Sequence, residues 1–131
     1  MRDPDDLTSA FEARTLPKEE WTHEAHVVVC WSTVARLGAD AALAHLQSAI
    51  PVYNEATNTP NSDTDGYHDT ITRYYVAAVG ALAGEPLDTV LAHPTCSRTA
   101  ALQFWSREAL FSVPARRGWV EPDLQPLPWP A

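Results

Sequence analysis

Apolar residues recur along most of the chain at the three- and four-residue spacing of helices, and little of the sequence alternates with the two-residue period of strands. Glycine and proline interrupt this pattern, because Gly38, Gly84 and Pro94 each follow an apolar stretch. We therefore expect an all-α fold, a compact bundle of about five or six helices. The predicted helices lie near residues 4–13, 18–37, 40–50, 65–83, 86–92 and 99–111.

Prolines set two further expectations. Pro51 should end or kink the third helix, because proline lacks the N–H that an α-helix uses. From Arg116 onward the chain contains four prolines and two tryptophans, so we expect an extended tail rather than a regular helix, anchored by Trp119 and Trp129. With 131 residues, the chain has the size of one domain, residues 1–131, with residues 114–131 packed on its body.

Charge narrows the expected partners. The formal net charge is −8, and Arg116-Arg117 is the only adjacent basic pair. Nucleic-acid binding needs clustered Lys and Arg, so we expect neither a nucleic acid nor an anionic membrane as partner. A small-molecule substrate is the expected partner, with a homo-oligomer left open.

The amino terminus, MRDPDDLTS, lacks the apolar core of a signal peptide, and no apolar run approaches the length of a membrane span. We therefore expect a cytoplasmic protein. Cys30 and Cys96 form no CxxC motif, and in that compartment they are expected to be unpaired and buried.

Two histidines lie three positions apart in WTHEAH, and GYHDTIT adds a third. On a helical wheel, His23 and His26 begin one apolar stripe and His68 begins another, with Ala25 and Thr70 on the opposite faces. Apolar stripes of this kind face a protein core. If the N-terminal ends of the two helices adjoin, the three histidines meet.

Three such imidazoles could hold one divalent transition metal, because an i,i+3 pair offers two ligands and a third completes the set. Zinc, iron and nickel are not separated by this ligand set. A metal on three neutral ligands keeps open positions and can polarise an oxygen or activate water. The pattern therefore predicts a metal-dependent lyase or dehydratase, hydrolase or isomerase that acts on a small polar molecule.

The polar segment between the third and fourth helices ends directly on His68. Long structureless connections are uncommon in compact domains, so we expect residues 54–66 to be ordered, with Asn54 and Asn61 turned inward. Thr72, one turn beyond His68, is the expected hydrogen-bond partner of that ligand. The candidate catalytic residues are Tyr53, Asn54, Asn61 and Tyr67.

Two alternatives stay open. In a metal-free enzyme, His68 or His23 would be the general base and Tyr53 or Tyr67 the acid. A non-catalytic module would bind a metal or a small ligand. A Cys30–His26 pair is also geometrically feasible. However, the apolar surroundings of Cys30 would raise the pKa of its thiol and make it less reactive. His45 and His93 are expected to be structural.

Three blocks, WTHEAH, YNEATNTPNSDTDGYHDTIT and WSREALFSVPARRGWVEPDLQPLP, resemble a family of small all-helical bacterial proteins of unknown function. The family has THxxH, YN…N…GYHxTxT and S-x-E-x-L…AR…W-x-x-P-D-L motifs, and the likeness covers most of residues 11–128. The resemblance implies no particular reaction. The positions that match its motifs are Thr22, His23, His26, Tyr53, Asn54, Asn61, Gly66, Tyr67, His68, Thr70, Thr72, Ser106, Glu108, Arg116, Trp119 and Asp123.

Overall fold

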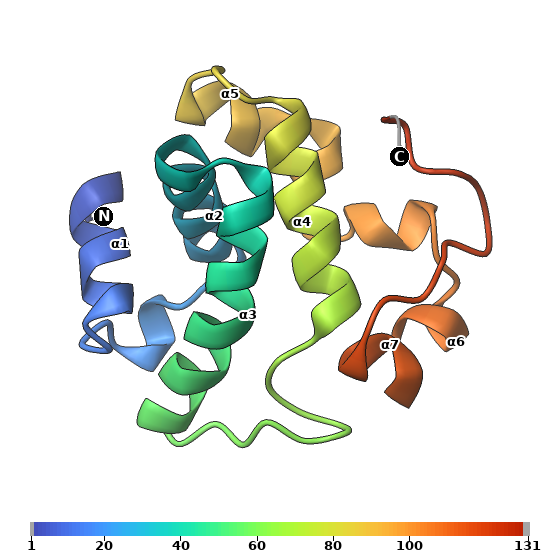
Figure 1. The fold of residues 1–131 in the computed structure, drawn as a ribbon, viewed down its shortest axis with the longest axis horizontal. Coiled ribbons are helices and arrows are strands. Elements are labelled where there is room, and N and C mark those ends of the chain that lie inside the picture. The colour runs from blue at the N-terminus through green and yellow to red at the C-terminus, as the bar shows by residue number, and fades with distance from the viewer. Residues whose placement is uncertain (1, 130–131) are drawn as a thin grey trace.

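The computed structural model describes residues 2–129 as an all-α protein (Figure 1), and no strand occurs in these residues. The predicted fold class is confirmed. None of the described helices is long and apolar enough to cross a membrane. In chain order the helices are α1 (Pro4–Glu12), the 3-10 helix η1 (Lys18–Glu20), α2 (His23–Leu37), α3 (Ala39–Ala56), α4 (Asp69–Ala81), α5 (Leu87–Ala92), the 3-10 helices η2 (Pro94–Cys96) and η3 (Ala100–Gln103), α6 (Arg107–Leu110) and α7 (Val113–Arg117).

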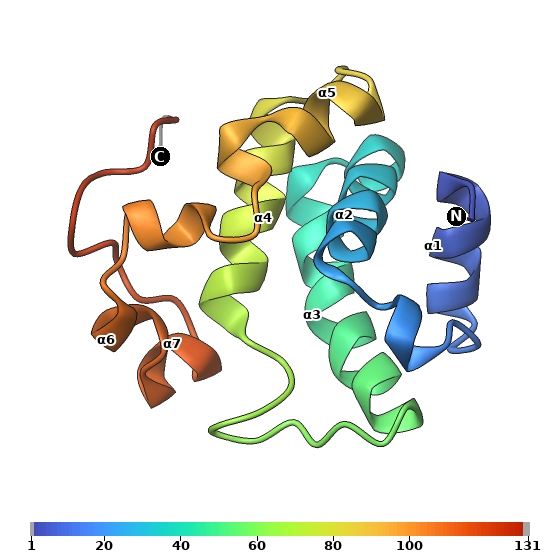
Figure 2. The same cartoon turned by 180° about the vertical axis from the view of Figure 1, so that it is seen from behind.

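Three helices, α2, α3 and α4, form the centre of the fold, and each packs against the other two. α2 and α4 run in the same direction and α3 runs the opposite way (Figure 1 and Figure 2). α1 covers the outer side of α2, α5 packs across the far end of α2, and α7 packs against α4. The core between them contains the largest fully buried side chains, Trp105, Tyr53 and Tyr74 among them.

Two predicted helices are wrong as continuous units. The helix expected over residues 18–37 is divided, because Thr22 is extended (φ −85°, ψ 174°) and its hydroxyl accepts a hydrogen bond from the backbone N–H of Ala25 at 3.2 Å. Residues 99–111 are divided by Ser106, whose hydroxyl caps α6 in the same way. A side-chain cap satisfies an N–H that would otherwise lack a partner, so it starts a new helix.

The expected end of the third helix is also wrong. α3 continues through Pro51 to Ala56. A proline inside a helix costs about 3 kcal/mol or more. Beyond it, Tyr53 is fully buried and Asn54 is 6% exposed, so packing of the last turn offsets that cost. The following helix, expected from residue 65, begins only after His68, which caps it.

The predicted stripes were too narrow. Ala25 and Thr70, expected on the outward faces of the two helices, are both buried. The reason is that α2 and α4 are each covered by several neighbours rather than by one. His26, expected to face the core, is an exposed residue.

The C-terminal segment, defined here as residues 118–129, is extended and lies across the body, as predicted, whereas Arg116 and Arg117 belong to α7. Trp119 lies edge-on against Trp105, with ring centres 5.5 Å apart. Trp129 lies 5.6 Å from the ring of Tyr74. Both predicted anchors are therefore packed on the core. The remainder of the predicted tail, residues 130 and 131, lies outside the described residues.

Candidate functional site

His68 is the N-cap residue of α4. Its Nδ1 accepts a hydrogen bond from the backbone N–H of Ile71 (3.2 Å), and its Nε2–H donates to the carbonyl oxygen of Leu110 (2.7 Å). This pattern fits the neutral Nε2–H tautomer. Burial lowers the pKa of the His68 ring, and the positive charge of Arg116 adds to that effect. Both ring nitrogens are therefore engaged in hydrogen bonds that hold the fold.

His23 lies in a different place. Its Nε2 bonds to the carbonyl oxygen of Cys96 (2.8 Å), and its ring lies edge-on to Tyr75, with centres 5.2 Å apart. Tyr75 is seven residues along α4 from His68, which at 1.5 Å per residue is about 10 Å. α2 therefore begins about two turns above the start of α4, and the two histidines do not meet.

His26 stacks on Trp21, with ring centres 3.7 Å apart, and its Nδ1–H donates to the carbonyl oxygen of Thr22 (2.7 Å). Desolvation by the packed neighbours lowers the pKa of His26, and the hydrogen bond to the carbonyl oxygen of Thr22 opposes that shift. The Cys30 thiol beside it is buried, which raises its pKa to about 12. A reactive Cys30–His26 pair is not supported by these surroundings.

The structure thus places the three histidines on three separate carbonyl groups. In residues 2–129, no group of three or more His, Cys, Asp or Glu side chains is placed to hold a metal ion. To bind a metal ion, the His68 ring would have to lose either the hydrogen bond from the N–H of Ile71 that caps α4 or the bond to the carbonyl oxygen of Leu110. Thr72 donates to the backbone oxygen of His68 (2.9 Å) rather than to its ring. The divalent metal stays a prediction, which elemental analysis after reconstitution with zinc, iron or nickel tests.

We expect His68→Ala to lower the free energy of unfolding by about 2–4 kcal/mol, because an N-cap is worth about 1 kcal/mol and an unpaired buried carbonyl costs about 1–3 kcal/mol. Urea denaturation at neutral pH measures this loss. His93→Ala is the matched control, since within residues 2–129 the ring of His93 bonds to Thr95 alone, two residues along. It should cost less than about 1 kcal/mol. Equal losses in the two variants would contradict a stabilising bond to Leu110.

The two asparagines singled out from the sequence fasten the loop before His68. Asn54 is buried, as predicted, and its Nδ2 donates to Asn61 Oδ1 (3.0 Å). The same oxygen accepts the backbone N–H of Tyr67 (3.0 Å), and Asn61 Nδ2 donates to the carbonyl oxygen of Pro51 (2.9 Å). Asn61 is an exposed residue whose side chain turns back toward α3. The order of this loop in solution stays a prediction.

Two arginines of α7 hold the same loop from the other side. Arg116 donates to the carbonyl oxygens of Gly66 (3.0 Å) and Tyr67 (3.3 Å). Arg117 forms a bidentate pair with Asp63, with both distances 2.8 Å. Asn54, Asn61 and Arg116 therefore connect the loop with α3 and α7. All the contacts described for these three residues serve this structural role.

Tyr53 belongs to the core. Its hydroxyl donates to the carbonyl oxygen of Leu16 (2.8 Å), and its ring packs against Phe11 and Trp21. Burial raises the pKa of the Tyr53 hydroxyl. Because this hydroxyl is already bonded inside the fold, it is not placed to act as an acid on a bound substrate.

Asp69, in the first turn of α4, is the centre of a polar cluster. It accepts hydrogen bonds from the Tyr67 hydroxyl (2.6 Å), from Gln47 Nε2 (3.0 Å) and from Arg73 Nε (2.8 Å). Burial opposes ionisation of Asp69, but these three donors outweigh it and lower the carboxyl pKa. Burial and the Asp69 carboxylate raise the pKa of the Tyr67 hydroxyl. The cluster therefore contains a fully bonded carboxylate beside a protonated tyrosine.

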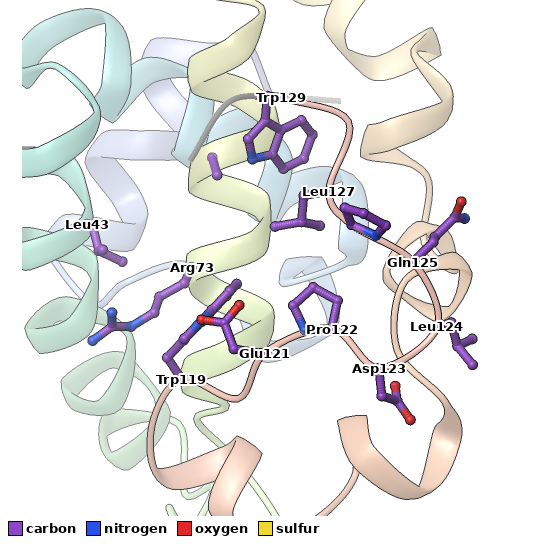
Figure 3. Close-up of a pocket in the computed structure, with 12 residues that line it drawn as sticks. Leu43, Arg73, Trp119, Glu121, Pro122, Asp123, Leu124, Gln125, Leu127 and Trp129 are labelled. Atoms are coloured by element: carbon purple, nitrogen blue, oxygen red, sulfur yellow. The ribbon is translucent and has the colours of Figure 1, made fainter.

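A groove of about 850 Å³ opens beside this cluster, between α3, α4 and the C-terminal segment (Figure 3). Leu43 and Ala77 line it from the helices, and Leu127 and Trp129 line it from the opposite side. Its walls are therefore largely apolar.

Two of the charged side chains that line the groove lie at one end, and the third, that of Asp123, lies apart from them beside Leu124 (Figure 3). The two at that end, Arg73 and Glu121, lie beside Trp119, whereas Leu127 and Trp129 lie at the other end (Figure 3). The indole N–H of Trp119 donates to Glu121 Oε1 (2.9 Å). The groove thus combines an apolar length with one polar end.

No sequence pattern had indicated a functional role for Asp69, Arg73 or Glu121. The first two carry opposite charges four residues apart, a spacing typical of a helix-surface pair, so part of the cluster was detectable. Glu121 lies in a proline-rich stretch that gives no such signal. Trp119 was expected only as an anchor.

No protein-family model, curated protein or solved structure matches this chain. The resemblance to small all-helical bacterial proteins stays a prediction. The fold and the groove together define an all-α protein with an open, mainly apolar site at its surface, and the functional assignment rests on that geometry.

Proposed function

We propose that this protein binds a small amphipathic molecule in the groove between α3, α4 and the C-terminal segment. The observation that carries the proposal is a groove of about 850 Å³ whose walls are mainly apolar and in which Arg73 and Glu121 lie beside Trp119 at one end. Binding sites for small molecules typically have volumes of about 300–1,000 Å³ and combine apolar walls with a few polar groups.

Hydrogen bonds hold the C-terminal wall of the groove in place. Asp123 accepts bonds from the backbone N–H and the hydroxyl of Ser106, both 2.7 Å long. The N–H of Leu124 donates to the carbonyl oxygen of Phe104 (2.9 Å), and the side chain of Gln125 donates to η3. A wall that is already fixed needs little ordering when a ligand binds, which favours affinity.

The engagement of Asp69 and Tyr67 favours binding over catalysis at the polar cluster beside the groove. Asp69 already accepts three hydrogen bonds, and the phenol of Tyr67 is held on it. Neither group offers a free base to a molecule in the groove. This proposal therefore develops the ligand-binding alternative, while the metal-dependent and metal-free enzymes stay separate predictions.

Filling the groove should block binding. We expect Ala77→Trp to weaken binding of 4-phenyl-1-butanol at least about tenfold, because the indole would occupy the space of the ligand. Titration of ¹⁵N-labelled protein, followed at the indole N–H signals of Trp119 and Trp129, measures the affinity. Ala44→Trp is the control, since Ala44 is exposed on α3 and does not line the groove.

Circular dichroism of both variants would establish that they fold. Equal binding by Ala77→Trp and the wild type, or no saturable shift of either indole signal in the wild type, would overturn the proposal.

A further inference from the structure

We infer that the groove selects a cation, namely a protonated amine carried on an apolar body. This inference rests on the proposed ligand-binding function and adds the charge of the ligand to it.

The charges around the groove favour a cation. Glu121 supplies a carboxylate and Arg73 a guanidinium at the polar end of the groove, and Asp123 adds a second carboxylate farther along the wall. Arg73 is already paired with Asp69, whose carboxylate lies 2.8 Å from Arg73 Nε and is 8% exposed. The whole chain carries a formal charge of −8. An anion would therefore be repelled at this end of the groove, whereas a cation would be attracted.

Glu121 is the carboxylate placed to accept the cation. Glu121 is an exposed residue whose Oε1 accepts the indole N–H of Trp119, which leaves Oε2 for another donor. In contrast, Asp123 uses both oxygens on Ser106. An ammonium group bonded to the free oxygen of Glu121 would gain a charge-assisted hydrogen bond, which is stronger than a bond between neutral groups.

The apolar body of the ligand would extend from this end along the groove. Ala77 and Leu43 line the helical side, and Leu127 and Trp129 lie at the far end (Figure 3). An unbranched chain or an aromatic group fits this course, because it removes apolar surface from water along the whole length of the groove. Charge and shape together specify an amine with a hydrophobic tail.

Three probes with the same body test the inference: 4-phenyl-1-butylamine, which is protonated at neutral pH, neutral 4-phenyl-1-butanol and anionic 4-phenylbutyrate. At low salt we expect the amine to bind most tightly and the acid most weakly, with about a five- to tenfold difference or more between those two. The difference should shrink at about 1 M salt, where the Debye length is about 3 Å. NMR titration at the Trp119 and Trp129 indole signals measures all three affinities.

The variant Glu121→Gln tests whether the preference for a cationic ligand depends on the charge of Glu121. Glutamine keeps an oxygen for the Trp119 indole and removes the charge, so the advantage of the amine over the alcohol should disappear while the alcohol binds as before. Glu55→Gln is the control, because Glu55 is an exposed residue of α3 that does not line the groove. It should leave the order of affinities unchanged.

The results distinguish failure of the cation preference from failure of the binding function. Equal affinities for the three probes, or tightest binding of the acid, would overturn the cation preference and leave the binding function standing. An unchanged amine advantage in Glu121→Gln would overturn the assignment to Glu121. Absence of saturable binding for all three probes would overturn the binding function itself.

Discussion

Truncation of the chain after Val113 should abolish cooperative folding. The missing segment supplies the carbonyl oxygen of Val120, which accepts the indole N–H of the fully buried Trp105 (2.8 Å). It also supplies the carbonyl of Gly118 to the buried Thr70 hydroxyl (2.7 Å). Each unpaired buried group costs about 1–3 kcal/mol, and native domains have only about 5–15 kcal/mol of stability in total. Loss of the contacts of α7 with α4 adds to this.

Thermal unfolding followed by near-ultraviolet circular dichroism measures the effect, and insoluble protein would be an equivalent result. A second truncation after Gln125 is the control, because it keeps the partners of Trp105 and Thr70 and removes Leu127 and Trp129 from the groove. This shorter deletion should leave a cooperative transition with a lower midpoint. An unchanged melting curve after the longer deletion would show that the C-terminal segment contributes nothing to stability.

Gly66→Ala should lower the free energy of unfolding by about 3–5 kcal/mol, at the upper end of single substitutions. Gly66 has a φ of +80°, a conformation that side chains with a Cβ rarely adopt. A Cβ there would overlap the carbonyl oxygen of Pro60 and lie 2.7 Å from Asn61 Oδ1. The clash would displace the side chain that connects Asn54 with Tyr67. Urea denaturation measures the loss.

Gly84→Ala is the control, because it measures the cost of the backbone conformation without a steric clash. Gly84 has a similar φ of +90°, but a Cβ there would meet nothing within 4 Å. This variant should cost only about 1–2 kcal/mol, the backbone penalty alone. A difference of less than about 1 kcal/mol between the two variants would contradict the close approach of the loop to Gly66.

The all-α class and most helices could be predicted from the sequence, because helix periodicity and chain punctuation are local properties. Two errors were also local. Thr22 and Ser106 are N-cap residue types directly before new helices, so the breaks at η1–α2 and before α6 were readable from sequence. The extension of α3 beyond Pro51 was not, since burial of Tyr53 and Asn54 decides it.

In the candidate site too, contacts between residues close in sequence could be predicted, whereas contacts between distant residues could not. Contacts over short separations, such as the seven residues between Asn54 and Asn61, follow from a loop that leaves a helix and returns. The partner of His68 is Leu110, 42 residues away, and the partner of Thr70 is Gly118, 48 residues away. No periodicity encodes such pairs.

By itself, the sequence determined the all-α class, the approximate positions of most helices and which chemical groups are present. Only the tertiary structure decided that His23 lies beside Tyr75 and not beside His68, and that Arg73 and Glu121 share the end of a groove. The physical reason is that helix formation depends on neighbouring residues, whereas the relative offset of packed helices depends on how side chains from distant parts of the chain fill a common core.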